Sequence, residues 1–487
     1  MTPGEIWVGS DDGLVHISID DGDSWQQITP KGLPVDATIS SLRTSVHQAG
    51  RAYLVAHRYR LGDDRPYLYV TDDRGRSWRN LASTLPQNMP LYAIAEDETD
   101  PAILYLGAER AIYASTDGGR HWRAIQLNLP PVAVVDLETA HGDLVLGTRG
   151  RGLYAFHDLA ALRMALRGQS DQAQLATPAP ATRWRQDYRW GEDNGSSNPP
   201  YGAIFSYYLP AKVDGELKLR ILDKDGQLVR ELSSTAKPRA GEKDDPDAPG
   251  EAPKPELSLD AGWHRVAWNL SYAGAQRLSG AKFFAGDPES GPLALPGSYR
   301  AELSGPNLAL GTEVTVLADP RSPVDTATMA EQLAFALQLR ADLERTRLGI
   351  EWLRAARVQA ADLSERLKDD QRHAELVAAA RAVTADADSI EGQMHNPEAK
   401  VAYDFLRGPK GPQLYSKLAG LFSSAQDSDH APSQGMRAQY ARFSAELATR
   451  EAAIAQMQGG SVATLEAAAA KAHLPRLILP ARTGSQP

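Results

Sequence analysis

The chain has 487 residues, and its 52 lysines and arginines against 62 acidic residues give a formal net charge of −10 at pH 7. This acidic balance argues against nucleic acid as a partner, because nucleic-acid binding needs a basic face. There is no cysteine, which excludes disulfides, thiolate metal sites and a cysteine nucleophile. No apolar run approaches the roughly 20 residues of a membrane span. We therefore expect a protein of several domains, with no membrane span, metal or cofactor.

Three regions of different composition follow one another along the chain. Residues 1–157 contain short apolar runs separated by Gly/Asp turns, which predicts strands. After a linker at 158–200, residues 201–318 are again strand-like, and residues 319–480 change to a helical period rich in Ala, Leu, Glu and Arg. Residues 237–256 combine Pro, Gly and charge without an apolar anchor, so we predict a mobile loop there.

The first region contains an internal repeat. A short apolar strand that ends in a small residue begins at Ile6, Tyr53, Leu104 and Leu144, at spacings of 47, 51 and 40 residues. A second strand of each unit is expected at 14–17, 67–70, 111–114 and 152–156. A period of about 40–50 residues with about four strands per unit is the signature of a β-propeller blade. Residues 1–157 thus supply three to four blades of an incomplete propeller.

Three of the units carry the motif [Ser/Thr]-x-Asp-x-Gly-x-x-Trp after the second strand. Its copies are Ser18, Asp20, Gly22 and Trp25; Thr71, Asp73, Gly75 and Trp78; and Ser115, Asp117, Gly119 and Trp122. In a hairpin turn the Asp can accept hydrogen bonds from backbone N–H groups about two residues further on. The Gly supplies a positive φ and the Trp buries a large area against the next strand. The motif therefore predicts a structural turn.

The alternative is that Asp20, Asp73 and Asp117 are catalytic carboxylates or metal ligands. They lie at equivalent points of different blades and are therefore spread around the rim, whereas a catalytic pair has to converge on one site. We accordingly prefer the structural interpretation and leave the catalytic residues unassigned.

The motif resembles the Asp-box, or BNR repeat, of sialidases, xyloglucanase-type glycosidases and the sortilin family. More widely, the chain resembles bacterial BNR-repeat proteins of the sortilin-like propeller group, often labelled glycosyl hydrolases, which end their propeller with a stretch like Gly147-Thr-Arg-Gly-Arg-Gly152. The resemblance implies six or more blades and a periplasmic or secreted location. It also implies that the chain is the C-terminal part of something larger, or that a second chain completes its ring.

Arg149 and Arg151 lie in this Gly-rich stretch. At the mouth of a propeller they could face an anionic ligand. The alternative is that they are solvated or paired within a loop. We retain both as candidate ligand-binding residues.

Residues 201–318 resemble the FlgD-like variant of an immunoglobulin-type sandwich. The resemblance rests on the stretch from Gly215 to Gly226, on 262–268 and on 296–299. Trp263 and Trp268 are five positions apart, and an odd spacing places them on opposite faces of a strand, so at least one belongs to the core.

In the last region an apolar stripe at helical spacing predicts a long first helix. It consists of Leu333, Leu337, Leu339, Leu343, Leu348 and Leu353. Further helices are predicted at 363–392, 398–424 and 432–457, with breaks that include Gly459-Gly460. Short connections favour an antiparallel helical bundle. The stretch 396–404 also resembles the helical tail of the BNR-repeat proteins.

For function, we prefer a non-catalytic propeller that binds a protein, peptide or glycan. The alternative is a glycoside hydrolase, sialidase-like or xyloglucanase-like, whose catalytic residues lie largely in a missing N-terminal part. A sialidase needs an arginine triad, which Arg149 and Arg151 cannot form alone. A third possibility is a partial product without a function of its own.

Overall fold

The computed structural model describes residues 3–126, 128–168, 170–185, 200–235, 256–283, 285–399 and 411–480. The chain forms two compact units, of which the first extends to Ala179 and the second begins at Pro180. The predicted mobile loop at 237–256 lies outside the described residues except for its last residue, as do 186–199 of the predicted linker and 400–410 of a predicted helix. No helix in the described part of the chain is long and apolar enough to cross a membrane.

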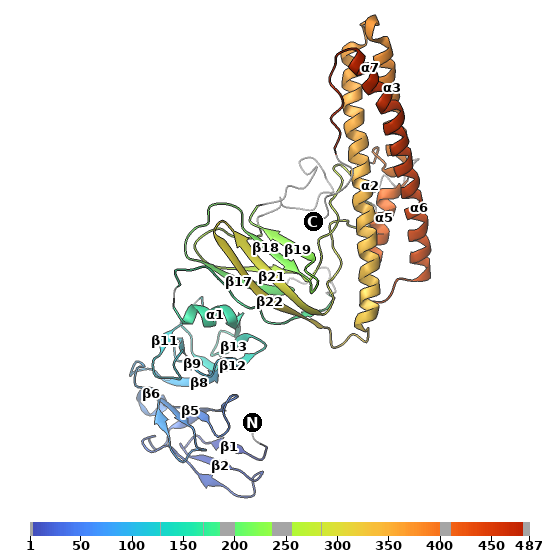
Figure 1. The fold of residues 1–487 in the computed structure, drawn as a ribbon. Coiled ribbons are helices and arrows are strands. Elements are labelled where there is room, and N and C mark those ends of the chain that lie inside the picture. Colours follow the sequence, from blue (N-terminus) through green and yellow to red (C-terminus); the bar gives the residue numbers. More distant parts are fainter. Residues whose placement is uncertain are drawn as a thin grey trace. The chain divides into compact units, whose positions relative to one another are not determined.

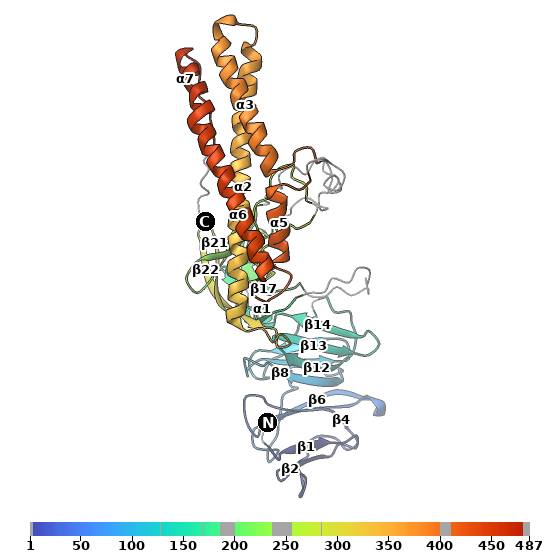
Figure 2. The same cartoon turned by 90° about the vertical axis from the view of Figure 1, so that its right-hand side faces the viewer.

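The first unit consists of four antiparallel sheets that follow one another in chain order (Figures 1 and 2). In the first sheet the strands are β1 (Ile6–Gly9), β2 (Val15–Ser18) and β3 (Gln26–Gln27). In the second they are β4 (Thr38–Thr44), β5 (Ala52–Arg58), β6 (Asp63–Thr71) and β7 (Arg79–Asn80), with the 3-10 helix η1 (Tyr59–Leu61) between β5 and β6. In the third they are β8 (Leu91–Glu96), β9 (Leu104–Ala108), β10 (Ile112–Ser115) and β11 (Arg123–Ala124). In the fourth they are β12 (Val134–Ala140), β13 (Asp143–Thr148) and β14 (Leu153–His157).

The two strands predicted for each repeat are confirmed as the pairs β1/β2, β5/β6, β9/β10 and β13/β14. The sequence did not reveal β4, β8 and β12, the strands that precede these pairs in the second, third and fourth sheets. These three strands form the contacts from one sheet to the next, β4 with β1, β8 with β5 and β12 with β8.

The small residue at the end of each first strand has a steric reason. A Cβ on Gly9 would lie 2.5 Å from Cγ2 of Ile39 in β4, and a Cβ on Gly107 would lie 2.5 Å from the carbonyl oxygen of Val134 in β12. A side chain at either position would collide with the first strand of the following sheet. The small residue in the repeat is therefore explained by the close approach of successive sheets.

Helix α1 (Leu159–Leu166) ends the run of sheets. Its side chains Leu159, Leu162 and Leu166 are buried in one cluster with residues of the third and fourth sheets. A cavity of about 50 Å³, lined in part by Ile125, Tyr154 and Leu162, lies in the same region. The fourth sheet lacks the [Ser/Thr]-x-Asp-x-Gly-x-x-Trp motif, whose three copies we label Asp-boxes after the repeat that they resemble. Helix α1 supplies apolar cover where the earlier sheets have a following sheet. One short strand, β15 (Gln174–Leu175), precedes the unit boundary.

The second unit begins with strands in two sheets. Strand β17 (Ala203–Leu209) pairs with β20 (Gly262–Trp268). A five-stranded sheet has the order β16 (Ala181–Arg183), β22 (Leu308–Ala318), β21 (Gly297–Gly305), β18 (Lys218–Leu222) and β19 (Leu228–Ser233). The ring of Trp268 on β20 packs edge-on against Tyr299 on β21 with 5.3 Å between ring centroids, which joins the two sheets. Trp268 is fully buried and Trp263 is half-buried, which confirms that one tryptophan belongs to the core.

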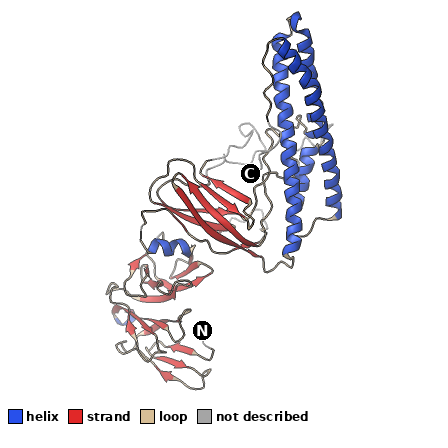
Figure 3. Ribbon diagram, in the orientation of Figure 1, coloured by secondary structure: helices blue, strands red, loops and turns tan. Residues whose placement is uncertain are grey.

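The helices of this unit follow β22 along the chain (Figure 3). They are α2 (Thr326–Leu367), the 3-10 helix η3 (Gln371–His373), α3 (Ala374–Met394), α5 (Leu414–Ser424), α6 (Gln434–Met457), the π-helix η4 (Gln458–Val462) and α7 (Ala463–Lys471). They share one apolar core with the loop residues Ala275, Leu278 and Ala281. The predicted break at Gly459-Gly460 is wrong, because the chain continues through the π-helix into α7. Burial of Val462 and Leu465 compensates for the poor helix propensity of the two glycines.

Candidate ligand-binding site

The three Asp-boxes have the same hydrogen bonds within their turns. The Ser or Thr hydroxyl donates to the Asp carboxylate and accepts from the backbone N–H of the Gly. The Asp carboxylate accepts from a backbone N–H four residues further on, and not two as expected from a simple Asx turn. The donors are Ser24 at 2.9 Å, Ser77 at 2.8 Å and His121 at 3.0 Å. Each box carboxylate is thus bound within its own turn.

Two of the box tryptophans join neighbouring sheets. Trp78 Nε1 donates to the carbonyl of Ile28 at 2.7 Å, and Trp122 Nε1 donates to the carbonyl of Leu81 at 3.0 Å. In each pair the acceptor belongs to the preceding sheet, not to the following one. Trp25 of the first box is 47% exposed, and no described residue accepts from its indole. Within the described residues, the tryptophan therefore bonds to a preceding sheet in the second and third boxes but not in the first.

The hydrogen bonds of the first box predict a loss of stability in acid. Donors from Ser24 and Ser18 lower the pKa of Asp20 to about 2, against about 3.9 in an unfolded chain. Because the folded-state pKa is the lower one, this stabilisation is present above about pH 4 and disappears as the pH falls towards 2. We expect the thermal midpoint of the first unit to fall over this window, and to fall less in Asp20→Asn. Asp21→Asn is the matched control, and an equal change in both variants would contradict the assignment.

Arg149 and Arg151 lie in the loop between β13 and β14, but the structure separates their side chains. Gly150 and Gly152 both have positive φ, and the N–H of Thr148 donates to the carbonyl of Gly152 at 3.1 Å, which closes a tight turn. The guanidinium of Arg149 lies 4.8 Å from the ring centroid of Tyr92 and 5.9 Å from that of Tyr59. Arg151 is exposed, and its side chain contacts no charged or aromatic partner in the described part of the chain.

The aromatic residues around Arg149 come from two further sheets. His57 is the last residue but one of β5 and Tyr59 begins η1, and their ring centroids lie 4.8 Å apart. Tyr92 on β8 lies 5.3 Å from His57 and 6.2 Å from Tyr59. With Arg149 from the fourth sheet, three consecutive sheets bring side chains together. We call His57, Tyr59, Tyr92, Glu109 and Arg149 the aromatic–arginine cluster.

This cluster lies at the sheet ends opposite the Asp-boxes. In the second sheet the box begins at Thr71, which pairs with Ala52 at the start of β5, whereas His57 lies near the other end of β5. In the third sheet a β-bulge between Leu91 and Ala93 places Tyr92 outside the regular pairing. Bulges redirect side chains and are frequent beside functional sites.

The electrostatics of the cluster follow from burial and from its charged members. The hydroxyl of Tyr92 donates to the carboxylate of Glu109. Burial, and then this hydrogen bond, raise the pKa of Tyr92 well above its ordinary value, so the phenol stays protonated. Burial, and then the positive charges of Arg60 and Arg149, lower the pKa of His57. The cluster thus combines a neutral imidazole, a protonated phenol and an exposed guanidinium.

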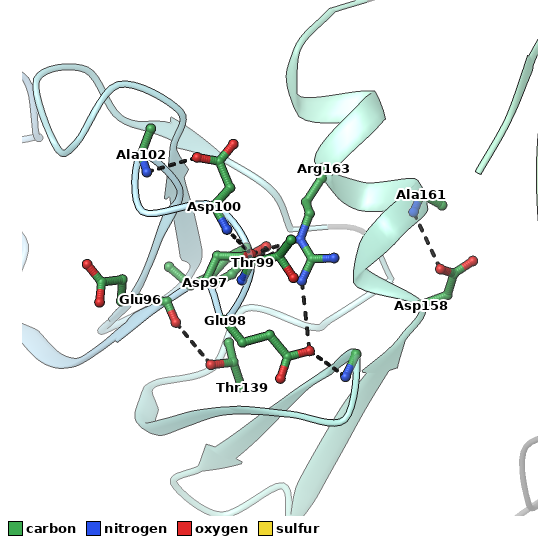
Figure 4. A network of polar contacts seen from close by, with 12 residues as sticks. Glu96, Asp97, Glu98, Thr99, Asp100, Ala102, Thr139, Asp158, Ala161 and Arg163 are labelled. Atoms are coloured by element: carbon green, nitrogen blue, oxygen red, sulfur yellow. Dashed lines mark hydrogen bonds and ion pairs between the residues drawn. The ribbon is translucent and has the colours of Figure 1, made fainter. Parts of the chain in front are cut away.

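A second polar network lies at the box ends of the same sheets (Figure 4). Asp97 is fully buried and accepts from Arg163 Nε at 2.8 Å and from the hydroxyl of Tyr105 at 2.9 Å. Its neighbour Glu96 accepts from the hydroxyls of Ser45 at 2.6 Å and Tyr53 at 2.9 Å.

These two adjacent acids could be mistaken for a catalytic pair. Glu96 is 7% exposed and Asp97 is 0% exposed, and each is bound by several internal donors. A carboxylate that is buried and saturated with donors has no lone pair free for a substrate. Their contacts connect α1 with the second, third and fourth sheets, which is a structural role. No group of three or more residues suited to hold a metal ion occurs among the described residues.

The sequence led to Arg149 only through its Gly-rich context. His57, Tyr59, Tyr92 and Glu109 belong to no recognisable sequence motif, and each is far from Arg149 in the sequence. A pattern search has no signal for them, because their proximity arises from the packing of sheets.

Comparisons with known proteins add little. No protein family and no curated protein matches the chain. Among solved structures, a GH74 xyloglucanase from Xanthomonas campestris is 20% identical, with a TM-score of 0.26, over 32% of this chain and 26% of that chain. YCF48 bound to D1 peptide is 15% identical, with a TM-score of 0.25, over 47% and 64%. A GH74 enzyme from Niastella koreensis is 12% identical, with a TM-score of 0.27, over 64% and 52%.

The matched region spans about a quarter of the length of the xyloglucanase and less than two thirds of the other two chains. All three TM-scores lie below 0.5, and likenesses at this level carry no conclusion about fold or function.

Proposed function

We propose that this chain is a non-catalytic binding protein, that its four sheets are blades of a β-propeller, and that the ligand binds at the sheet ends opposite the Asp-boxes. The supporting observation is the convergence of Arg149, Tyr59 and Tyr92 from three consecutive sheets. Tyrosine and arginine are strongly enriched among the residues that dominate binding energies. The proposed ligand is a protein, peptide or glycan.

The alternative is a glycoside hydrolase, which requires two carboxyl groups roughly 5–10 Å apart across the scissile bond. Glu109 is the one carboxylate of the aromatic–arginine cluster, and the hydroxyl of Tyr92 donates to it. Glu96 and Asp97 are buried within the sheets. This arrangement favours binding over hydrolysis.

Arg149→Ala should weaken ligand binding about tenfold or more, because a charged donor contributes roughly 1.5–3 kcal/mol. Arg151→Ala removes the same charge from the same loop but leaves the cluster unchanged, so the loss of ligand affinity in this variant should be distinctly smaller. We suggest screening the full chain on peptide and glycan arrays, followed by calorimetry on the strongest ligand. Equal losses in the two variants would mean that net charge, and not the cluster, determines binding.

Hydrolysis can be tested separately. The full chain is incubated with sialosides and β-glucans, and released sugar is measured for the wild type and for Glu109→Gln. We expect no turnover. Turnover that Glu109→Gln abolishes would replace the binding function with a glycosidase.

We also propose that the two sheets of the second unit form a FlgD-like sandwich of the immunoglobulin type and that the helices form an accessory bundle. The packing of Trp268 against Tyr299 between the two sheets supports the sandwich. From the resemblance of its Asp-boxes, we propose a periplasmic or secreted location.

A further inference from the structure

Two cations share one tyrosine ring in the aromatic–arginine cluster. The guanidinium carbon of Arg60 lies 5.8 Å from the centroid of Tyr59, and that of Arg149 lies 5.9 Å from the same centroid. Neither guanidinium forms an ion pair with a carboxylate among the described residues. By contrast, the neighbouring Arg58 has a carboxylate partner, since its Nη1 lies 3.7 Å from Asp63.

Two unpaired cations held around one ring repel each other, and a bound anion removes this repulsion. Their combined field already reaches the interior, because Arg60 and Arg149 act together with burial to lower the pKa of His57. Glu109 offsets only part of this charge, because its carboxylate carries one negative charge against the two positive charges of Arg60 and Arg149.

We infer that Arg60 and Arg149 bind carboxylates of an acidic polypeptide segment, with Tyr59 as the floor of the site. This inference rests on the proposed binding function and specifies its ligand. Guanidinium groups bind carboxylates through two parallel hydrogen bonds. Stacking on an aromatic ring fixes the orientation of the guanidinium, so less conformational entropy is lost when these bonds form.

The aromatic ring itself disfavours a neutral glucan. A neutral sugar binds a tyrosine mainly by stacking on the ring, and here the ring of Tyr59 already has guanidinium groups over it. Recognition then depends on the N–H donors of the two arginines, which select for anions.

The surroundings favour a polypeptide over an acidic glycan. Three exposed apolar side chains belong to the same sheet ends: Leu61 of η1 at 57% exposure, Val35 at 75% and Leu153 at 79%. The carbonyl of Val35 accepts from Arg58 Nε at 3.0 Å, and Leu153 follows the Arg149 loop at the start of β14. Apolar side chains can bury the side chains of a peptide, whereas sugar hydroxyls would be left without partners against them.

The test uses the full chain and two matched octapeptide libraries. Each peptide of the first carries two glutamates among apolar residues, and glutamine replaces both in the second; sialyllactose and a xyloglucan oligosaccharide are the sugar probes. We expect the acidic library to bind, the glutamine library to bind about tenfold more weakly, and salt from about 0.05 to about 0.5 M to weaken binding. Arg60→Gln and Arg149→Gln should each cause about a tenfold loss, whereas Arg120→Gln, in the third box at the other sheet end, is the control and should stay within about twofold.

Equal binding of both libraries, or unchanged binding in Arg60→Gln and Arg149→Gln, would overturn the inference and leave the binding function standing. Binding of sialyllactose without the peptides would replace the polypeptide with an acidic glycan. If neither these probes nor the peptide and glycan arrays bind, the binding function fails as well.

Discussion

Replacing Trp122 with alanine should destabilise the interface between the second and third sheets by about 3 kcal/mol, whereas Trp25→Ala should cost less than about 1 kcal/mol. The two residues have the same position in the same motif and differ only in their surroundings. Trp122 packs against the apolar cluster between these sheets and donates to Leu81. Trp25 is 47% exposed, and its indole has no acceptor among the residues that the structure describes. The loss at Trp122 combines an emptied cavity with an unpaired carbonyl.

Hydrogen exchange of the strands before each box is the suitable measurement, β1 and β2 for Trp25 and β9 and β10 for Trp122. Global unfolding is not a single transition, because the chain has two units. Trp122→Phe keeps most of the ring and removes the donor, so it should give an intermediate loss. Equal losses of protection in Trp25→Ala and Trp122→Ala would show that the contact to the preceding sheet does not stabilise the box.

Arg163→Leu should destabilise the first unit by roughly 3–5 kcal/mol, because it leaves the carboxylate of Asp97 buried without its cation. Arg163 Nε lies 2.8 and 2.9 Å from the two oxygens of Asp97, which has no exposed surface. Local hydrogen exchange of β8, β9 and α1 would report the loss.

The same helix provides the control. Arg167 pairs with Asp100 at 2.8 Å, but its side chain is 66% exposed, so Arg167→Leu should cost less than about 1 kcal/mol. Adding Asp97→Asn to Arg163→Leu should recover part of the stability, because the buried charge is removed. A similar cost for Arg163→Leu and Arg167→Leu would show that Asp97 is reached by water after the change.

Local features were predictable from the sequence. The strands of the repeat and the turns of the Asp-boxes depend on residues a few positions apart, such as Ser18, Asp20 and Ser24, which bond to one another. The direction of the tryptophan contacts was not predictable in this way. Trp78 and Trp122 bond to the preceding sheet, whereas the motif indicated only burial against the next strand.

In the helical region, too, local sequence predicted some features and tertiary packing decided others. Its composition and leucine spacing predicted helices, and α2 buries Leu333, Leu339, Leu343 and Leu353. Gly459-Gly460 indicated an end because glycine costs about 1 kcal/mol per residue in a helix. Packing of the neighbouring side chains exceeds this cost, and such packing is not visible in a local pattern.

The sequence by itself determined the repeat, the turns within it and the Gly-rich loop that carries Arg149, because each depends on residues close together in the chain. Only the tertiary structure decided what surrounds Arg149. Tyr59 and Tyr92 come from other sheets, and a bulge in the pairing of β8 with β9 takes Tyr92 out of the regular register. The aromatic–arginine cluster forms because successive sheets stack with a defined register, and that stacking is a long-range result of packing.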